Sequence, residues 1–219
     1  MATWIMHLRV AEKLRNLLGD LDETAYYVGA IAPDSGKMVD DFTYLPPKDV
    51  SHWKRDDVSY EQRFWDNTQF YKKYCENEKD IFRKSLCWGY YVHILTDTIY
   101  VRDIIHPYIN KHGKPHWREN ITDIRKGWYE IDFRFLAENP DFIPFQMIKK
   151  TEPFDNSFLD YFAPNDVYER IRNAIDLYSN SAVNPNCRFF THTPEEAVIL
   201  ANRMNEEITN FLKTNIMKK

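Results

Sequence analysis

The chain has 219 residues, of which 43% are hydrophobic and 28% charged, a balance typical of a protein with a buried core. A net charge of −4 argues against nucleic acid as a partner, and no run of 18 apolar residues predicts a membrane span. The chain shows no signal-peptide pattern, and its three cysteines form no CxxC pair, so we expect a cytoplasmic protein. The sequence does not indicate an oligomeric state.

Helical periodicity dominates the first half of the chain. The spacing of apolar residues predicts helices over residues 7–18, 22–32, 59–75 and 78–105. Gly19 ends the first helix, Pro33 the second and Pro107 the last. Residues 35–52 are polar and contain Pro46 and Pro47, so we expect a loop there.

The second half follows the same pattern. Helices are predicted over residues 120–138, 165–180 and 194–214, the last of which opens with a capping box and proline at its first position. Residues 107–119 read as a polar loop, and residues 139–164, with four prolines, as irregular. No strand pair or repeat is evident. We therefore expect an all-α fold, with six or seven packed helices forming one domain over residues 1–219.

One residue pair in the long helix has the spacing of a metal site. His93 and Asp97 are four residues apart, so an imidazole and a carboxylate lie on the same helical face and can reach one ion. Gly89, one turn earlier, allows another backbone or a ligand to approach closely. Taken alone, a pair with this spacing is more often a hydrogen-bonded His–Asp contact, because the pattern is short.

Further polar residues stand in apolar surroundings. His7 lies on the apolar face of its helix, Asp34 follows the apolar run VGAIAP, and His52 ends a loop in the triplet SHW. A buried imidazole needs partners for both nitrogens, although a lone one is usually satisfied within the core. Asp34 alone could be a turn-forming residue after proline.

Asp132 adds a carboxylate on an apolar helical face. It lies on the same side as Trp128, Ile131 and Phe135. Such a carboxylate is costly unless it is paired or bound to a metal. Several such residues in one helical chain favour a shared metal site over separate structural roles.

Four short motifs resemble one known family. They are HLRVAEKL at 7–14, APDS at 32–35, SHW at 51–53 and HILTD at 93–97. In this order they resemble the zinc-dependent phospholipase C family, which is distantly akin to single-strand-specific zinc nucleases. The resemblance covers residues 1–135, with residues 165–214 as a helical C-terminal extension.

The resemblance implies an all-α fold with a cluster of zinc ions. Asp34, His52, His93 and Asp97 would bind one ion, while His7 and Asp97 would bind a second, so that Asp97 bridges the two. One or two zinc ions are therefore expected.

The third site of the family departs from its pattern here. Asp103 stands where the family has a histidine, and Trp128 and Asp132 stand in place of a histidine–carboxylate pair. This site would be empty or would hold Mg²⁺ or Mn²⁺, which prefer oxygen ligands. The family also uses the amine of an N-terminal tryptophan, whereas the equivalent Trp4 is preceded by three residues, so its nitrogen cannot ligate.

The function implied is metal-dependent hydrolysis of a phosphoester, of the phosphodiesterase type found in phospholipase C. A metal-bound hydroxide would attack a small-molecule phosphoester, with Asp34 as the catalytic residue that orients or deprotonates the water. Two alternatives stay open: a catalytically degenerate all-α metal-binding protein, and a structural or interaction module without metal. A His-Asp phosphohydrolase is disfavoured, because no histidine is directly followed by aspartate.

Overall fold

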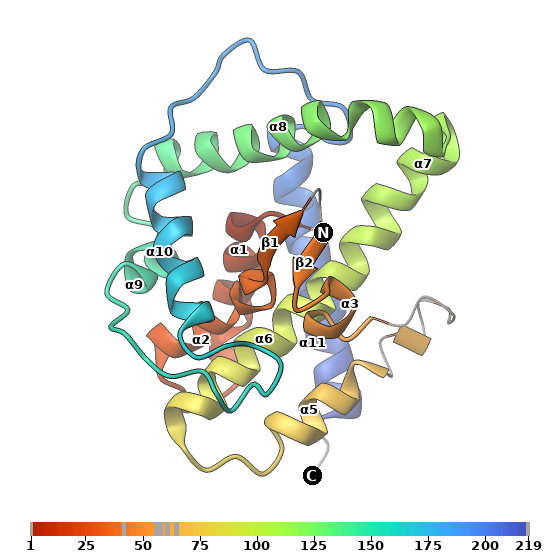
Figure 1. Ribbon diagram of the computed structural model, residues 1–219. Helices are drawn as coiled ribbons and strands as arrows, with labels where there is room; N and C mark the ends of the chain where they lie inside the picture. The colour runs from red at the N-terminus through yellow and green to blue at the C-terminus, as the bar shows by residue number, and fades with distance from the viewer. Residues whose placement is uncertain (1, 41–42, 55–58, 60–61, 64–65, 218–219) are drawn as a thin grey trace.

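Helices form most of the computed structural model, which describes residues 2–40, 43–54, 59, 62–63 and 66–217 (Figure 1). The N-terminal elements are α1 (Trp4–Leu14), the 3-10 turn η1 (Arg15–Leu17), α2 (Glu23–Gly29), the 3-10 turn η2 (Ala32–Ser35), β1 (Lys37–Asp40), β2 (Thr43–Leu45) and α3 (Lys48–Ser51). The later elements are α5 (Thr68–Tyr74), α6 (Ile81–Tyr100), the π-helical turn η3 (Val101–Ile105), α7 (His106–His112), α8 (Lys114–Glu138), α9 (Ile143–Ile148), α10 (Asp166–Ser179) and α11 (Pro194–Asn215). The predicted helical class is confirmed. None of the described helices is both long and apolar enough to cross a membrane.

The centre of the fold is the close pairing of α2 with α6. A Cβ atom added at Gly89 would lie only 1.9 Å from the carbonyl oxygen of Tyr26, and one added at Gly29 only 1.9 Å from that of Leu86. Each glycine therefore lets the backbone of one helix touch the other, as the sequence suggested for Gly89. This contact places the following turn of α6, which carries His93, directly beside the end of α2.

Local capping residues set where several helices begin. The Asp22 carboxylate accepts the N–H of Ala25 at the start of α2. The predicted capping box of α11 is present, with Thr193 and Glu196 each accepting the other's backbone N–H. α11 packs against α1, α6 and α8, and α10 against η2, so both C-terminal helices contribute to the core around α1 and α6.

Two segments predicted as loop or irregular contain regular structure. Residues 35–52 hold the antiparallel hairpin β1–β2, whose strands are short and mostly exposed and so give no alternating apolar pattern. Residues 139–164 contain α9, with a proline in its first turn, where a missing N–H costs nothing. Because β1 and β2 form a hairpin, the prediction that the chain has no strand pair was wrong.

The predicted stop at Pro107 and the polar loop predicted over residues 107–119 were also wrong, because this segment is almost entirely helical. α6, η3 and α7 run on without a break to His112, with Pro107 in the first turn of α7 (Figure 1). The chain then turns at Gly113, whose φ of +88° is readily adopted only by glycine, and α8 begins at once. Of the helix predicted over 59–75, α5 is the part that the structure shows clearly, while residues 60–61 and 64–65 lie outside the described residues.

Candidate metal centre

Five side chains from four parts of the chain meet beside α6. They are His7 on α1, Asp34 on η2, His52 directly after α3, and His93 and Asp97 on α6. All five are largely buried, with His7 and His93 at 0% exposure and Asp34 at 9%. Two triads have ligand atoms that all lie within 4.8 Å of one another: His7, His93 and Asp97, and Asp34, His52 and His93. The structure thus brings together five of the seven side chains named from the sequence.

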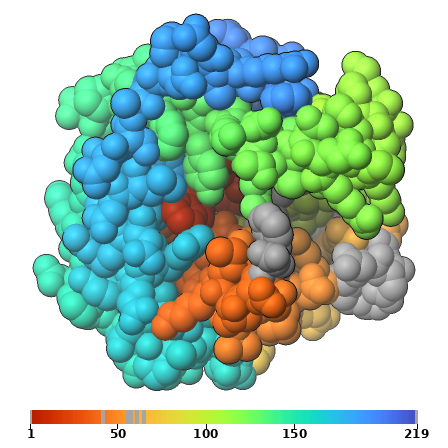
Figure 2. Space-filling model, turned by 45° about the horizontal axis from the view of Figure 1, so that its top comes forward, coloured from red at the N-terminus to blue at the C-terminus, as the bar shows by residue number. Residues whose placement is uncertain are grey.

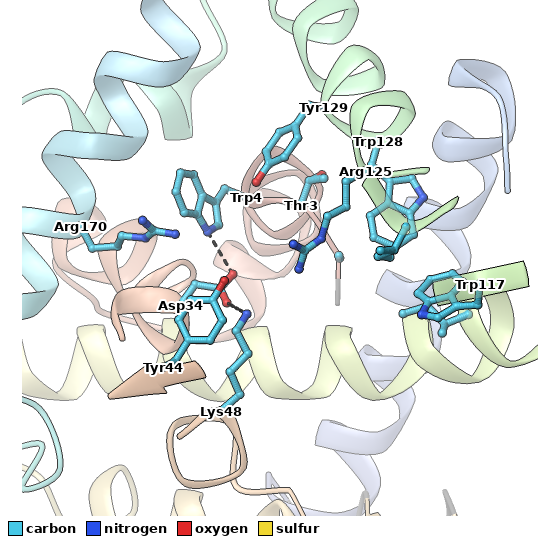
Figure 3. A pocket seen from close by; sticks show the side chains of 13 residues that line it. Thr3, Trp4, Asp34, Tyr44, Lys48, Trp117, Arg125, Trp128, Tyr129 and Arg170 are labelled. Carbon is cyan, nitrogen blue, oxygen red and sulfur yellow. Dashed lines mark hydrogen bonds and ion pairs between the residues drawn. The ribbon is translucent and has the colours of Figure 1, made fainter. Parts of the chain in front are cut away.

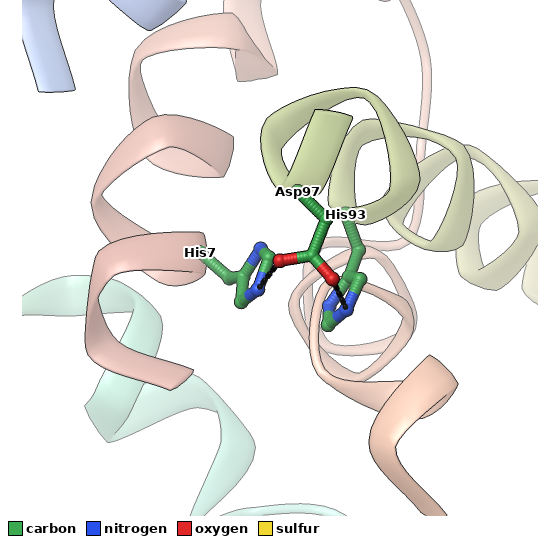
Figure 4. Close-up of side chains that lie close together, drawn as sticks. All are labelled: His7, His93 and Asp97. Carbon is green, nitrogen blue, oxygen red and sulfur yellow. Dashed lines mark ion pairs between the residues drawn. The ribbon is translucent and has the colours of Figure 1, made fainter. Parts of the chain in front are cut away.

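Asp97 lies between the histidines and presents one oxygen to each side. Its Oδ1 is 3.4 Å from Nε2 of His7 (Figure 4). Its Oδ2 is 3.6 Å from Nε2 of His52 and 3.8 Å from Nε2 of His93. Asp34 completes the group, with its Oδ1 3.4 Å from Nε2 of His52. The two oxygens of Asp97 therefore face different histidines, which is the arrangement of a bridging carboxylate.

These separations fit a metal better than they fit hydrogen bonds. A good N–H···O bond spans about 2.7–3.2 Å between heavy atoms, shorter than any of the four distances. Two ligand atoms that each lie about 2.1 Å from a tetrahedral zinc ion are separated by about 3.4 Å. The Nε2 atoms of His7, His52 and His93 and the Oδ2 atom of Asp97 are buried and have no hydrogen-bond partner among the described residues. Each such atom costs roughly 1–3 kcal/mol, which a shared cation would recover.

Contacts behind the rings orient two of the histidines. Nδ1 of His93 lies 2.8 Å from the carbonyl oxygen of Ala30, so this nitrogen carries the proton and Nε2 turns its lone pair to the cluster. Nδ1 of His52 lies 2.9 Å from the hydroxyl of Ser51. His7 differs, because neither ring nitrogen has a hydrogen-bond partner among the described residues and its ring stacks on His93 with 3.5 Å between centroids.

The protonation states of the group suit a cation. Burial, followed by the neighbouring His7, holds the pKa of His93 well below its ordinary value, and burial also lowers the pKa of His52. Burial alone would raise the pKa of Asp34, but Lys48 and His52 outweigh it and keep that pKa well below its usual range. At neutral pH His52 and His93 are therefore neutral and Asp34 is charged, which are the forms that bind metals.

The segment before α1 lies against the same carboxylates. The backbone N–H of Ala2 donates to Oδ1 of Asp97 at 2.8 Å, and the indole N–H of Trp4 donates to Oδ2 of Asp34 at 3.0 Å. The ammonium group of Lys48 lies 3.1 Å from Oδ1 of Asp34. Neither Ala2 nor Lys48 was predictable from the sequence, since neither residue type signals a metal site.

Two cavities adjoin the group on different sides. One, of about 160 Å³, is bordered by Asp34 and by residues 2–4. Figure 2 shows a hollow here, with the N-terminal residues (red) at its floor. The hairpin (orange), α10 (cyan) and α8 (green) form its edges. The other, of about 20 Å³, is lined by residues that include His52 and Asp97. Because a water molecule needs roughly 10–15 Å³ of such space, the smaller cavity has room for about one water or ion.

The chain was compared with known proteins in three ways. No family model, no characterised protein and no solved structure matches it. The resemblance to the zinc-dependent phospholipase C family therefore rests on the four sequence motifs.

The remaining two predicted ligands lie apart from this group. Asp103, on the π-helical turn, receives hydrogen bonds from Arg102 and Arg203. Asp132 accepts hydrogen bonds from the hydroxyls of Thr3, at 2.7 Å, and Tyr178, at 2.6 Å. Among the described residues, neither aspartate belongs to a group of three ligand atoms, so the predicted third site is not assembled in this structure.

Asp132 differs from the clustered carboxylates in its electrostatics. It is 1% exposed, and burial raises its pKa to about 7 despite the hydrogen bonds of Tyr178 and Thr3. Asp103, in contrast, is engaged by arginines on η3 and α11. The carboxylates of both residues are satisfied by protein donors, which accounts for their burial without a metal. Whether either residue binds Mg²⁺ or Mn²⁺ stays a prediction.

Proposed function

We propose that this chain is a zinc-dependent phosphoester hydrolase of the phospholipase C-like kind, with a helical fold of that family. One observation carries the proposal: the buried Nε2 atoms of His7, His52 and His93 have no hydrogen-bond partner among the described residues, and each lies 3.4–3.8 Å from an oxygen of Asp97. Divalent cations held by this group would satisfy these atoms.

The donor set favours zinc over harder ions. Three imidazoles and two carboxylates suit zinc, whereas magnesium and calcium prefer sites made of oxygen alone. The position of Asp97, with one oxygen toward His7 and the other toward His52 and His93, supports two ions that share this carboxylate. Asp34 would complete the side nearer the large cavity.

Asp34 would act on the attacking water as an orienting group. A bound zinc ion supplies Lewis acidity, which lowers the pKa of a coordinated water towards about 7 and offsets negative charge on a phosphoryl oxygen. Asp34 borders the cavity, and its Oδ1 and Oδ2 are already contacted by Lys48 and Trp4. Because its pKa lies well below the usual range, it is a weak base and holds a water by accepting a hydrogen bond rather than by taking its proton.

A second function is a metal-binding protein without turnover. It is favoured by the positions of Asp103 and Asp132, whose oxygens accept bonds from protein donors. With two ions rather than three, phosphoryl charge would be stabilised less in the transition state. Metal content alone does not separate this function from hydrolysis, so turnover must be measured as well.

The test combines elemental analysis with turnover of two generic substrates. The purified protein should contain one or two zinc ions per chain and should hydrolyse p-nitrophenyl phosphate or bis(p-nitrophenyl) phosphate. Chelation should abolish turnover, and added zinc should restore it. His52→Gln should lose both zinc and activity, while His192→Gln, which replaces a buried histidine outside the cluster, should lose neither. Zinc without any turnover would favour the second function, and a protein that binds no divalent metal would refute both.

A further inference from the structure

Two polar side chains that line the large cavity beside Asp34 form no hydrogen bond with any described residue. They are Tyr129 on α8 and Arg170 on α10, and polar atoms make up most of the surface of this cavity. Figure 3 shows the two side chains reaching toward the space beside Asp34 from different helices. Polar groups that line a cavity and lack partners in the chain are available to a bound ligand.

Arg170 has no carboxylate partner among the described residues. Its guanidinium group lies over the indole ring of Trp4, with Cζ 4.5 Å from the ring centroid, and its buried Nε atom has no hydrogen-bond partner in the described part of the chain. The carboxylates of Asp166 and Glu169, which precede it on α10, instead contact the ammonium group of Lys37 at 2.9 and 3.2 Å. A guanidinium group is always charged and has five N–H donors, so Arg170 keeps donors for an anion.

The two other cations that line the cavity are engaged within the protein. The ammonium group of Lys48 lies 3.1 Å from Oδ1 of Asp34, and both Lys48 and Arg125 have further interactions in the chain. Of the cations in the described lining, Arg170 is therefore the one whose donors are left to a ligand.

Tyr129 offers a hydroxyl group to the same space. Its ring packs near Phe133 and Tyr178, with 6.3 Å between centroids in each case. Burial, followed by the nearby charge of Asp34, raises the pKa of this hydroxyl, so it stays protonated at neutral pH and can donate a hydrogen bond. In Figure 3 its oxygen points toward the cavity, which makes Tyr129 a second donor beside Arg170.

Trp4 connects Arg170 to the metal centre. The guanidinium group lies over its indole ring, while the indole N–H donates to Oδ2 of Asp34 at 3.0 Å. Stacking restrains the plane of the guanidinium group, so its N–H groups are presented in a fixed fork. Asp34 in turn lies 3.4 Å from Nε2 of His52. An anion held by Arg170 would therefore lie near the carboxylate that borders the candidate metal centre.

We propose that Arg170 and Tyr129 bind the phosphoryl oxygens of the substrate that do not contact the metal centre. A phosphoryl group presents its oxygens in different directions, so one can face the ions beside Asp34 while others accept hydrogen bonds from the guanidinium and hydroxyl groups. The assignment rests on the proposed hydrolase function, whose substrate these two residues would hold.

The test measures binding of phenylphosphonate, a phosphate analogue without an ester bond, by isothermal titration calorimetry of the protein supplied with zinc. Arg170→Gln should weaken binding about tenfold or more, because it removes a charged donor. Tyr129→Phe should weaken binding about three- to tenfold, because it removes a single hydroxyl group. Arg170→Lys keeps the charge but not the fork of donors, so it should recover only part of the affinity.

Matched variants on α10 control for general effects. Arg172→Gln removes an exposed arginine and Tyr168→Phe removes a tyrosine hydroxyl outside the cavity, so both should leave the affinity for phenylphosphonate unchanged. Zinc content and melting temperature are measured for every variant. Arg170→Gln should lower the melting temperature by less than about 4 °C, because only the contact with Trp4 is lost. A larger loss of stability with unchanged affinity would show that Arg170 only covers Trp4, and would overturn its assignment.

The two glutamine and phenylalanine variants decide the binding site. An affinity within twofold of the wild type in Arg170→Gln or in Tyr129→Phe would overturn the role of that residue, and a wild type that does not bind phenylphosphonate would overturn both. Turnover of p-nitrophenyl phosphate, measured in parallel, tests the hydrolase separately. Weaker binding in both variants of a protein without turnover would support the site and refute the hydrolase, whereas turnover with unaltered affinities would leave the hydrolase standing and overturn the site.

Discussion

If the proposed zinc binds here, replacement of Asp97 by asparagine should remove the stabilisation that the ion would give to this fold. The side chain keeps its shape, and its remaining oxygen can still accept the N–H of Ala2, so packing is preserved. It loses the charge and one oxygen of the carboxylate that faces His7 on one side and His52 and His93 on the other. Asp97→Asn should therefore disrupt binding at both sides of the group.

The magnitude follows from mass action. Zinc at a free concentration of 100 times its dissociation constant stabilises the folded state by about 2.7 kcal/mol. For a chain of 219 residues, each kcal/mol shifts the melting temperature by about 2–4 °C, so chelation should lower it by about 5–11 °C in the wild type. In Asp97→Asn the same treatment should lower it by less than about 2 °C, since little metal is bound.

Differential scanning fluorimetry with and without chelator measures this difference, and elemental analysis of the same samples reports the zinc. His192→Gln is the control, because it alters a buried side chain outside the cluster and should show the wild-type shift. An unchanged zinc content in Asp97→Asn, or an equal chelator shift in the two proteins, would refute the assignment of Asp97 as the shared ligand.

Three other predictions follow from different parts of the structure. Gly89→Ala should lower the free energy of unfolding, measured by urea denaturation, by about 3 kcal/mol or more, because the new Cβ would lie 1.9 Å from the carbonyl oxygen of Tyr26. Near wild-type stability of this variant would contradict the close approach of α2 and α6. Burial lowers the pKa of His192 to about 4, so its neutral form contributes stability above about pH 6.5 that is lost as the pH falls toward 4. The melting temperature of His192→Gln should consequently fall less than that of the wild type over this range, and parallel curves would disprove the shift. Asp132→Asn should keep its tightly bound zinc but lose activity, since this side chain anchors the segment that lies on the metal centre; unchanged turnover and metal stoichiometry would show that Asp132 has no part in the site.

Several helices were predictable because their signals are local. The apolar face that includes Val10 and Leu14 and the capping box at Thr193 depend on residues within a turn or two of one another. The hairpin and the helix through Pro107 were missed, since exposed short strands have no apolar alternation and a proline in a first helical turn interrupts nothing. The positions of five candidate ligands followed from residue type, spacing and a family resemblance.

The sequence by itself determined which histidines and aspartates stand in apolar surroundings and on which helical face each one lies. Only the tertiary structure decided which of them meet. Asp97 receives the N–H of Ala2 from 95 positions away, and no local spacing could reveal that contact or exclude Asp103 and Asp132 from the group. The cavity beside Asp34 is likewise lined by residues from α1, α8, α10 and the hairpin, which are far apart in the sequence. The physical reason is that helix formation depends on nearby residues, whereas a binding site depends on how whole helices pack against one another.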